Sequence, residues 1–127
     1  MDHKDLIVWQ KSMALASFIY SLTRGFPREE LFGLTNQMRR AVVSIPSNIA
    51  EGLSRGTDKE FVFFLRIAKG SAAEVETQLL LSKKLGYIND REIKRALTLY
   101  NEIIRMLGTL IMKIGKRIEV GARGFAD

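Results

Sequence analysis

Cysteine is absent from the 127-residue chain, and histidine occurs once, at His3. Without cysteine there is no thiol nucleophile or disulfide framework, and zinc sites built from Cys and His lose their ligands. A single His at the start of the chain also leaves Ser-His-Asp triads and the Glu-x-x-His pairs of helical di-iron proteins without their parts. The sequence therefore predicts a protein that is not an enzyme and that uses no cofactor or metal.

Proline is almost absent as well, since only Pro27 and Pro46 interrupt the chain, and no stretch alternates with the period of a strand. Apolar residues recur instead at spacings of three and four, which is typical of helices. We predict helices at about 5–24, 28–51, 58–85 and 90–114, and a frayed tail at 115–127. Short connections between long helices favour antiparallel neighbours, so the predicted fold is all-α: an up-down-up-down antiparallel four-helix bundle forming one domain over 1–127.

Local signals refine these bounds. Thr57 and Glu60 match the capping box that opens a helix, and Asn89 or Asp90 is expected to cap the fourth helix. Pro46 removes the hydrogen bond to the carbonyl of Val42, so a kink or a local break is predicted near residues 44–48.

Long hydrophobic runs and a secretory signal are also lacking. The longest late apolar run, residues 106–112, is far shorter than the roughly 20 residues that cross a bilayer. We therefore expect a cytoplasmic protein without a membrane partner.

The third and fourth helices nevertheless carry more apolar surface than one bundle needs. The surplus residues are Phe63, Phe64 and Ile67 on the third helix and Ala96, Leu99, Ile103, Met106 and Leu110 on the fourth. A helix that is apolar nearly all round is buried nearly all round, so we predict self-association. The alternative is that these wide stripes only fill a thick core.

Polar residues form stripes on two helices. They are Gln37, Arg40, Ser44, Asn48 and Glu51 on the second helix, and Ser71, Glu74 and Gln78 on the third. If the stripes face each other, they form a structural network in which Arg40 meets Glu74 and Asn48 bonds the carbonyl freed by Pro46. The alternative is a catalytic site in which Glu51 and Glu74 act as paired carboxylates in general acid/base work.

Positive charge is in excess, with 20 Lys and Arg against 14 Asp and Glu. The net charge of +6 is spread along the chain and is not confined to a tail. The residues that the apolar stripes do not need are the candidates for contacts with nucleic acid: Arg39, Arg55, Arg66, Lys69, Lys94, Arg95 and Arg105. On a monomer such residues form a solvated face, whereas in a symmetric oligomer they can join into a band that binds phosphates with little sequence preference.

Several segments resemble one family. They are residues 6–13 with Trp9, the turn at 26–34, the run Gln-Met-Arg-Arg-Ala at 37–41, Ser-Ile-Pro-Ser-Asn-Ile-Ala-Glu-Gly at 44–52, the pattern Gly70, Ser71, Glu74, Gln78, and Leu-Gly-Tyr at 85–87. This chain resembles the four-helix bundle family of 23S ribosomal RNA intervening-sequence proteins over residues 6–114.

The resemblance implies an up-and-down bundle that assembles as a homopentamer with a central channel. The family is named for reading frames inserted into bacterial large-subunit ribosomal RNA genes, and this name gives a gene's location and no function. A related basic bundle, the accessory protein of diversity-generating retroelements, binds its reverse transcriptase and nucleic acid. We hypothesise a non-enzymatic oligomer that presents a basic surface to RNA or DNA; the alternative is an adaptor that docks an acidic protein such as a reverse transcriptase.

Overall fold

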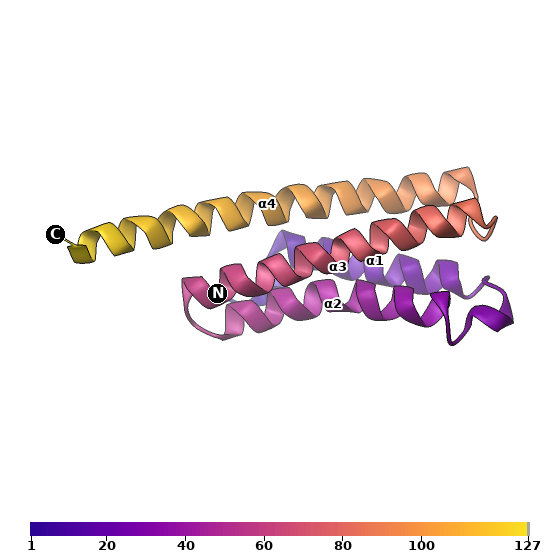
Figure 1. Ribbon diagram of the computed structural model, residues 1–127, viewed down its shortest axis with the longest axis horizontal. Coiled ribbons are helices and arrows are strands. Elements are labelled where there is room, and N and C mark those ends of the chain that lie inside the picture. Colours follow the sequence, from indigo (N-terminus) through magenta and orange to yellow (C-terminus); the bar gives the residue numbers. More distant parts are fainter. Residues whose placement is uncertain (127) are drawn as a thin grey trace.

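The computed structural model describes residues 1–126 and the side chains of residues 1–122. The helices are the 3₁₀ turn η1 (His3–Asp5), α1 (Ile7–Thr23), the 3₁₀ turn η2 (Arg28–Glu30), α2 (Leu34–Ser54), α3 (Asp58–Lys84) and α4 (Asp90–Ala126). No strand occurs within residues 1–126, so the predicted all-α class with four helices is confirmed. The four α-helices lie side by side with their long axes roughly aligned (Figure 1).

The helices pack as α1 on α2, α2 on α3, α3 on α4, and α4 on α1. Ser82 of α3 donates a hydrogen bond to the sulfur of Met38, and further along α2 the hydroxyl of Ser44 meets that of Ser71. Partners on α3 recede as α2 advances, so these two helices are antiparallel. The largest fully buried side chains come from all four helices: Leu15, Ile19, Met38, Ile45, Ile49, Leu65, Leu79, Ile103 and Leu107.

The second helix begins six residues later than the sequence predicts, at Leu34. Residues 28–30 form the separate turn η2, and Gly33 follows with a backbone conformation outside the helical region. Glu30 fixes this segment, because its carboxylate accepts a hydrogen bond of 2.9 Å from the hydroxyl of Tyr87 and lies 3.5 Å from the amide nitrogen of Leu34. A contact between residues distant in sequence thus replaces the expected first turn.

Both predicted helix starts after the second helix are confirmed. The hydroxyl of Thr57 accepts a bond of 3.2 Å from the amide of Glu60 and donates one of 3.0 Å to its carboxylate. Asn89 forms the reciprocal box, since its side chain accepts from the amide of Glu92 and its own amide donates to the Glu92 carboxylate. Gly86, with a φ of 80°, makes the tight turn that leads from α3 to this cap.

The local break expected at Pro46 is wrong, because α2 is continuous from Leu34 to Ser54. Pro46 is itself buried among the core residues of the helix. Burial of Ile45, Pro46 and Ile49 in the core therefore supports the helical path where one backbone hydrogen bond is missing.

The frayed tail is also wrong over the residues that the structure describes, since α4 continues to Ala126 and extends past the other helices (Figure 1). Gly115 and Gly121 disfavour a helix by roughly 1 kcal/mol each but do not end it. Ile118 packs against the core, and the guanidinium of Arg117 binds both carboxylate oxygens of Asp58, at 2.6 and 2.8 Å. Asp127 lies outside the described residues. Within residues 1–126, no helix is both long enough and apolar enough to span a bilayer.

The surplus apolar residues divide into two groups. On α4, Ala96 and Ile103 are buried within the chain, and Leu99, Met106 and Leu110 pack against the core. On α3, Phe63 is 60% exposed and Ile67 is 38% exposed. The wide stripe of α4 thus fills the core in large part, as the alternative holds, although Met106 and Leu110 also line an open hollow. On α3, Phe63 and Ile67 remain uncovered.

Candidate nucleic-acid interface

The centre of the predicted polar network lies between α2 and α3. The hydroxyls of Ser44 and Ser71 are 2.8 Å apart, and the amide nitrogen of the Asn48 side chain donates to both the hydroxyl and the backbone carbonyl of Ser44. The expectation that Asn48 bonds the carbonyl freed by Pro46 is wrong, because that carbonyl belongs to Val42. These three residues form the part of the network that the structure brings together.

Next to this centre, polar residues line an open hollow of about 450 Å³. We call this the α2–α3 hollow; its lining is Phe32, Asn36, Gln37, Arg40, Ala41, Ser44, Ser71, Glu74 and Gln78. Arg40 and Glu74 share the hollow, but no ion pair joins them within residues 1–122. The Oε1 atom of Gln78 is buried and has no hydrogen-bond partner among the described side chains. One polar atom at this hollow therefore lacks the hydrogen bond that buried polar atoms usually make.

Glu51 does not belong to the network. Its carboxylate binds the guanidinium of Arg55, at 2.6 and 3.0 Å, and this guanidinium also lies over the ring of Phe64. Glu51 is therefore level with residue 64 of α3, ten residues from Glu74, which corresponds to roughly 15 Å along a helix. Carboxylate pairs that work together in hydrolysis are roughly 5 to 9.5 Å apart, so the two-carboxylate alternative does not fit this geometry.

No group of three or more His, Cys, Asp or Glu side chains is arranged to hold a metal ion in the part of the chain with described side chains.

The seven cations predicted as nucleic-acid contacts are distributed over three helices. Arg39 lies near the start of α2 and Arg55 directly follows its end. Arg66 and Lys69 belong to α3, and Lys94, Arg95 and Arg105 belong to α4. Only Arg55 is ion-paired among the described residues. No two of the seven line the same hollow, so the structure does not bring them together as one site.

Two of these cations are held in place by neutral neighbours. The Nε atom of Arg39 donates to the hydroxyl of Thr23, and its guanidinium lies 4.7 Å from the centre of the Tyr20 ring. The guanidinium of Arg95 lies 4.7 Å from the centre of the Phe18 ring. Both are fixed in position without being neutralised.

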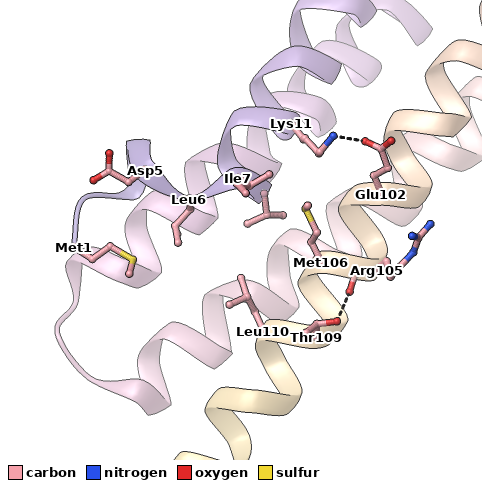
Figure 2. A pocket seen from close by; sticks show the side chains of 11 residues that line it. Met1, Asp5, Leu6, Ile7, Lys11, Glu102, Arg105, Met106, Thr109 and Leu110 are labelled. Atoms are coloured by element: carbon pink, nitrogen blue, oxygen red, sulfur yellow. Dashed lines mark hydrogen bonds and ion pairs between the residues drawn. The ribbon is translucent and has the colours of Figure 1, made fainter.

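An apolar hollow of about 700 Å³ lies between the start of the chain and α4. Figure 2 shows Leu6 and Ile7 facing Met106 and Leu110 across it, while Arg105 points away. At one end Lys11 and Glu102 form an ion pair of 2.6 Å. We call this the α1–α4 hollow.

Comparisons with known proteins agree with this architecture. Residues 4–109 match the family model described as 23S rRNA-intervening sequence protein. The chain belongs to this family. A solved structure from the S23 ribosomal protein family of Bacteroides thetaiotaomicron, described as a protein with unknown function, is similar: the TM-score is 0.78, with 27% sequence identity over 88% of this chain and 99% of that one. The search of curated proteins gives no match.

The structure also brings together a group of arginines that the sequence analysis does not predict as contacts for nucleic acid. Arg24 and Arg28 flank the turn at Pro27, and both line one hollow together with Arg39. Arg40, which we assigned to the structural network, lines the next hollow with Arg39. The available signals were the two arginines on either side of Pro27 and the adjacent pair at 39–40, in segments treated only as turn and helix.

Proposed function

We propose that this member of the family is a non-enzymatic, cytoplasmic up-down-up-down bundle that assembles as a homo-oligomer and presents a basic surface to RNA or DNA. The observation that carries this proposal is that most of the candidate cations are exposed and have no ion-pair partner among the described residues. Arg66, Lys69, Lys94 and Arg105 are exposed, and none of them has a carboxylate partner within the described residues. Unpaired cations are free to replace the counterions of a phosphate backbone.

Self-association is supported by two separate apolar surfaces. One is on the outer side of α3, where Phe63 and Ile67 are exposed one helical turn apart, and the other is the α1–α4 hollow. Because α3 packs on α2 and α4 but not on α1, these surfaces lie on different sides of the chain. Two different complementary surfaces favour a head-to-tail interface, which closes into a ring.

Assembly would multiply the charge. In the homopentamer that the family resemblance implies, six positive charges per chain become about +30 in the ring. A single chain has dispersed cations, whereas a ring repeats each of them at a fixed spacing. This is the arrangement that a long polyanion binds well.

The test is purification at low salt, followed by light scattering for the assembly mass and by nuclease digestion of any passenger that absorbs in the ultraviolet. We expect a mass of several chains and a passenger that RNase or DNase removes. A protein that stays monomeric at micromolar concentration and shows no salt-dependent retention of RNA or DNA would refute the proposal. A co-purifying acidic protein without nucleic acid would favour the adaptor function instead.

A further inference from the structure

Three hollows join across the outer side of α2. The first, of about 290 Å³, lies beside the Pro27 turn and is lined by Arg24, Arg28 and Arg39 among others. The second, of about 500 Å³, shares Arg39 with the first and adds Arg40 and Tyr20. The third is the α2–α3 hollow, which shares Asn36, Arg40 and Ser44 with the second. Because each hollow shares lining residues with the next, the three are adjacent, and we call the surface that they form the arginine groove.

The charged residues that line the arginine groove are mostly positive. Arg24, Arg28, Arg39 and Arg40 have no ion pair among the described residues, and Glu74 at the far end is the only acidic residue that lines any of the three hollows. Glu29 and Glu30 are adjacent to Arg28 in sequence, and the Glu30 carboxylate is engaged by the hydroxyl of Tyr87. The groove therefore offers several guanidinium groups to an anion.

The guanidinium of Arg39 is already held in a fixed position by its neighbours. The hydroxyl of Thr23, which is itself buried, donates to the carbonyl of Ile19 and accepts the Nε hydrogen of Arg39. Tyr20 covers one side of the guanidinium. The Nη groups have no described partner, so a planar fork suited to phosphate is held at the junction of two hollows at little further cost in side-chain entropy.

The far end of the groove has a different chemistry. Phe32 lines the α2–α3 hollow and is 90% exposed, so its ring is accessible to a bound molecule. Asn36, Gln37 and Gln78 line the same hollow with amide side chains. An exposed aromatic ring beside amide donors and acceptors suits an unstacked nucleobase.

We propose that the arginine groove binds single-stranded nucleic acid, with the phosphodiester backbone on Arg24, Arg28, Arg39 and Arg40 and a base stacked on Phe32. In a duplex the bases are paired and stacked on each other, so they cannot stack on the Phe32 ring. This inference rests on the proposed nucleic-acid binding and deepens it, because it assigns the binding to one groove in place of a dispersed surface.

The test uses the full chain and fluorescence anisotropy with a labelled single-stranded RNA of mixed sequence, and with its duplex, at two salt concentrations. The double variant Arg28→Gln with Arg40→Gln removes two groove cations whose side chains make no described hydrogen bond. The matched control is Lys59→Gln with Lys84→Gln, which removes the same charge from exposed positions of α3 that belong neither to the groove nor to the candidate cations. Circular dichroism melting establishes that both variants fold.

We expect the groove variant to bind single strands at least about tenfold more weakly. The slope of log K against log salt should become shallower by about 1.4, at roughly 0.7 for each lost phosphate contact. The control variant should lose less than about threefold, and Phe32→Ala should weaken binding to the single strand and leave duplex binding unchanged.

Other outcomes would overturn the groove, the proposed function or the kind of ligand. Equal losses in the groove and control variants would overturn the groove and leave the proposed function standing. No binding of either RNA by the wild-type chain at low salt would overturn the proposed function and the groove together. Competition by polyglutamate as strong as that by RNA of equal charge would overturn the assignment to nucleic acid, because it would identify a surface for acidic proteins.

Discussion

Gly52 of α2 and Phe64 of α3 lie so close that a Cβ atom on Gly52 would be 2.7 Å from the Cβ of Phe64. The ring and the carbonyl of Phe61 would be 3.2 and 3.3 Å from the same atom. Backbone and Cβ atoms cannot rotate away, so α2 and α3 would have to separate. We predict that Gly52→Ala lowers the free energy of unfolding by about 1–3 kcal/mol, measured by urea denaturation.

Gly70 provides the matched control for this substitution. It lies within α3, and nothing is within 4 Å of an added Cβ. Gly70→Ala should therefore raise the free energy of unfolding by about 0.5–1 kcal/mol, since alanine costs less backbone entropy in a helix. If both variants change stability in the same direction, the close approach at Gly52 does not hold.

Gln78 carries an unmet hydrogen bond. Its buried Oε1 atom has no partner among the described side chains, and such an atom costs about 1–3 kcal/mol. We predict that Gln78→Met raises the free energy of unfolding by about 1 kcal/mol. Gln37→Met, at an exposed position of the same hollow, should change it by less than about 0.5 kcal/mol. A loss of stability in Gln78→Met would mean that an ordered water satisfies the oxygen.

Glu51 and Glu74 should behave as independent residues. Glu51 binds Arg55 at the end of α2, whereas Glu74 lines the α2–α3 hollow. We predict that Glu51→Gln costs about 0.5 kcal/mol or less, as for an exposed ion pair, and that the effects of Glu51→Gln and Glu74→Gln on unfolding add in the double variant. Non-additivity above about 0.5 kcal/mol in a double-mutant cycle would place the two carboxylates in contact.

The end of α4 should respond to acid through Asp58. The hydrogen bonds from Arg117 hold the pKa of the Asp58 carboxyl below its ordinary value. Because this pKa is lowered in the folded state, the contribution of the pair to stability is present above the pKa of the unfolded chain and disappears as the pH falls through the folded pKa. In an NMR titration the Asp58 midpoint should lie below the ordinary value of about 3.9, and Arg117→Gln should return it to that value.

Amide hydrogen exchange over residues 115–122 measures the same pair independently. Exchange there should accelerate in Arg117→Gln at neutral pH, because the last turns of α4 lose their ion pair with Asp58 of α3. Thr98, on the exposed side of α4 and far from this pair in sequence, marks a segment whose exchange should not change. An unchanged rate over residues 115–122 would contradict a role for Arg117 in holding the helix.

The sequence predicts those parts of the fold that depend on neighbouring residues. The helix starts at Thr57 and Asn89 follow from side chains that reach three residues along the chain, and such contacts leave a readable pattern. The predictions for the start of α2 and for the end of α4 are wrong, because each of these boundaries depends on a contact with a residue distant in sequence. Glu30 bonds Tyr87, and Arg117 binds Asp58.

The same distinction applies to the candidate site. Ser44 and Ser71 lie on stripes with helical periodicity, so their meeting could be predicted. Arg24 and Arg28 belong to a turn, where no periodicity indicates which way a side chain points. Their convergence with Arg39 depends on how α1 and α2 pack, which is a tertiary property.

The proposed ring makes a prediction about mixtures. Ile7 lies in the α1–α4 hollow and is 59% exposed, and Phe63 is exposed on the outer face of α3. If these surfaces bind each other head to tail, Ile7→Glu disables one surface and Phe63→Glu the other, so each variant alone should be monomeric. An equimolar mixture should then form a heterodimer, because the intact hollow of one variant meets the intact α3 face of the other. Light scattering gives the mass; with an interface in which each surface binds its own copy, the mixture would contain only the species that each variant forms alone.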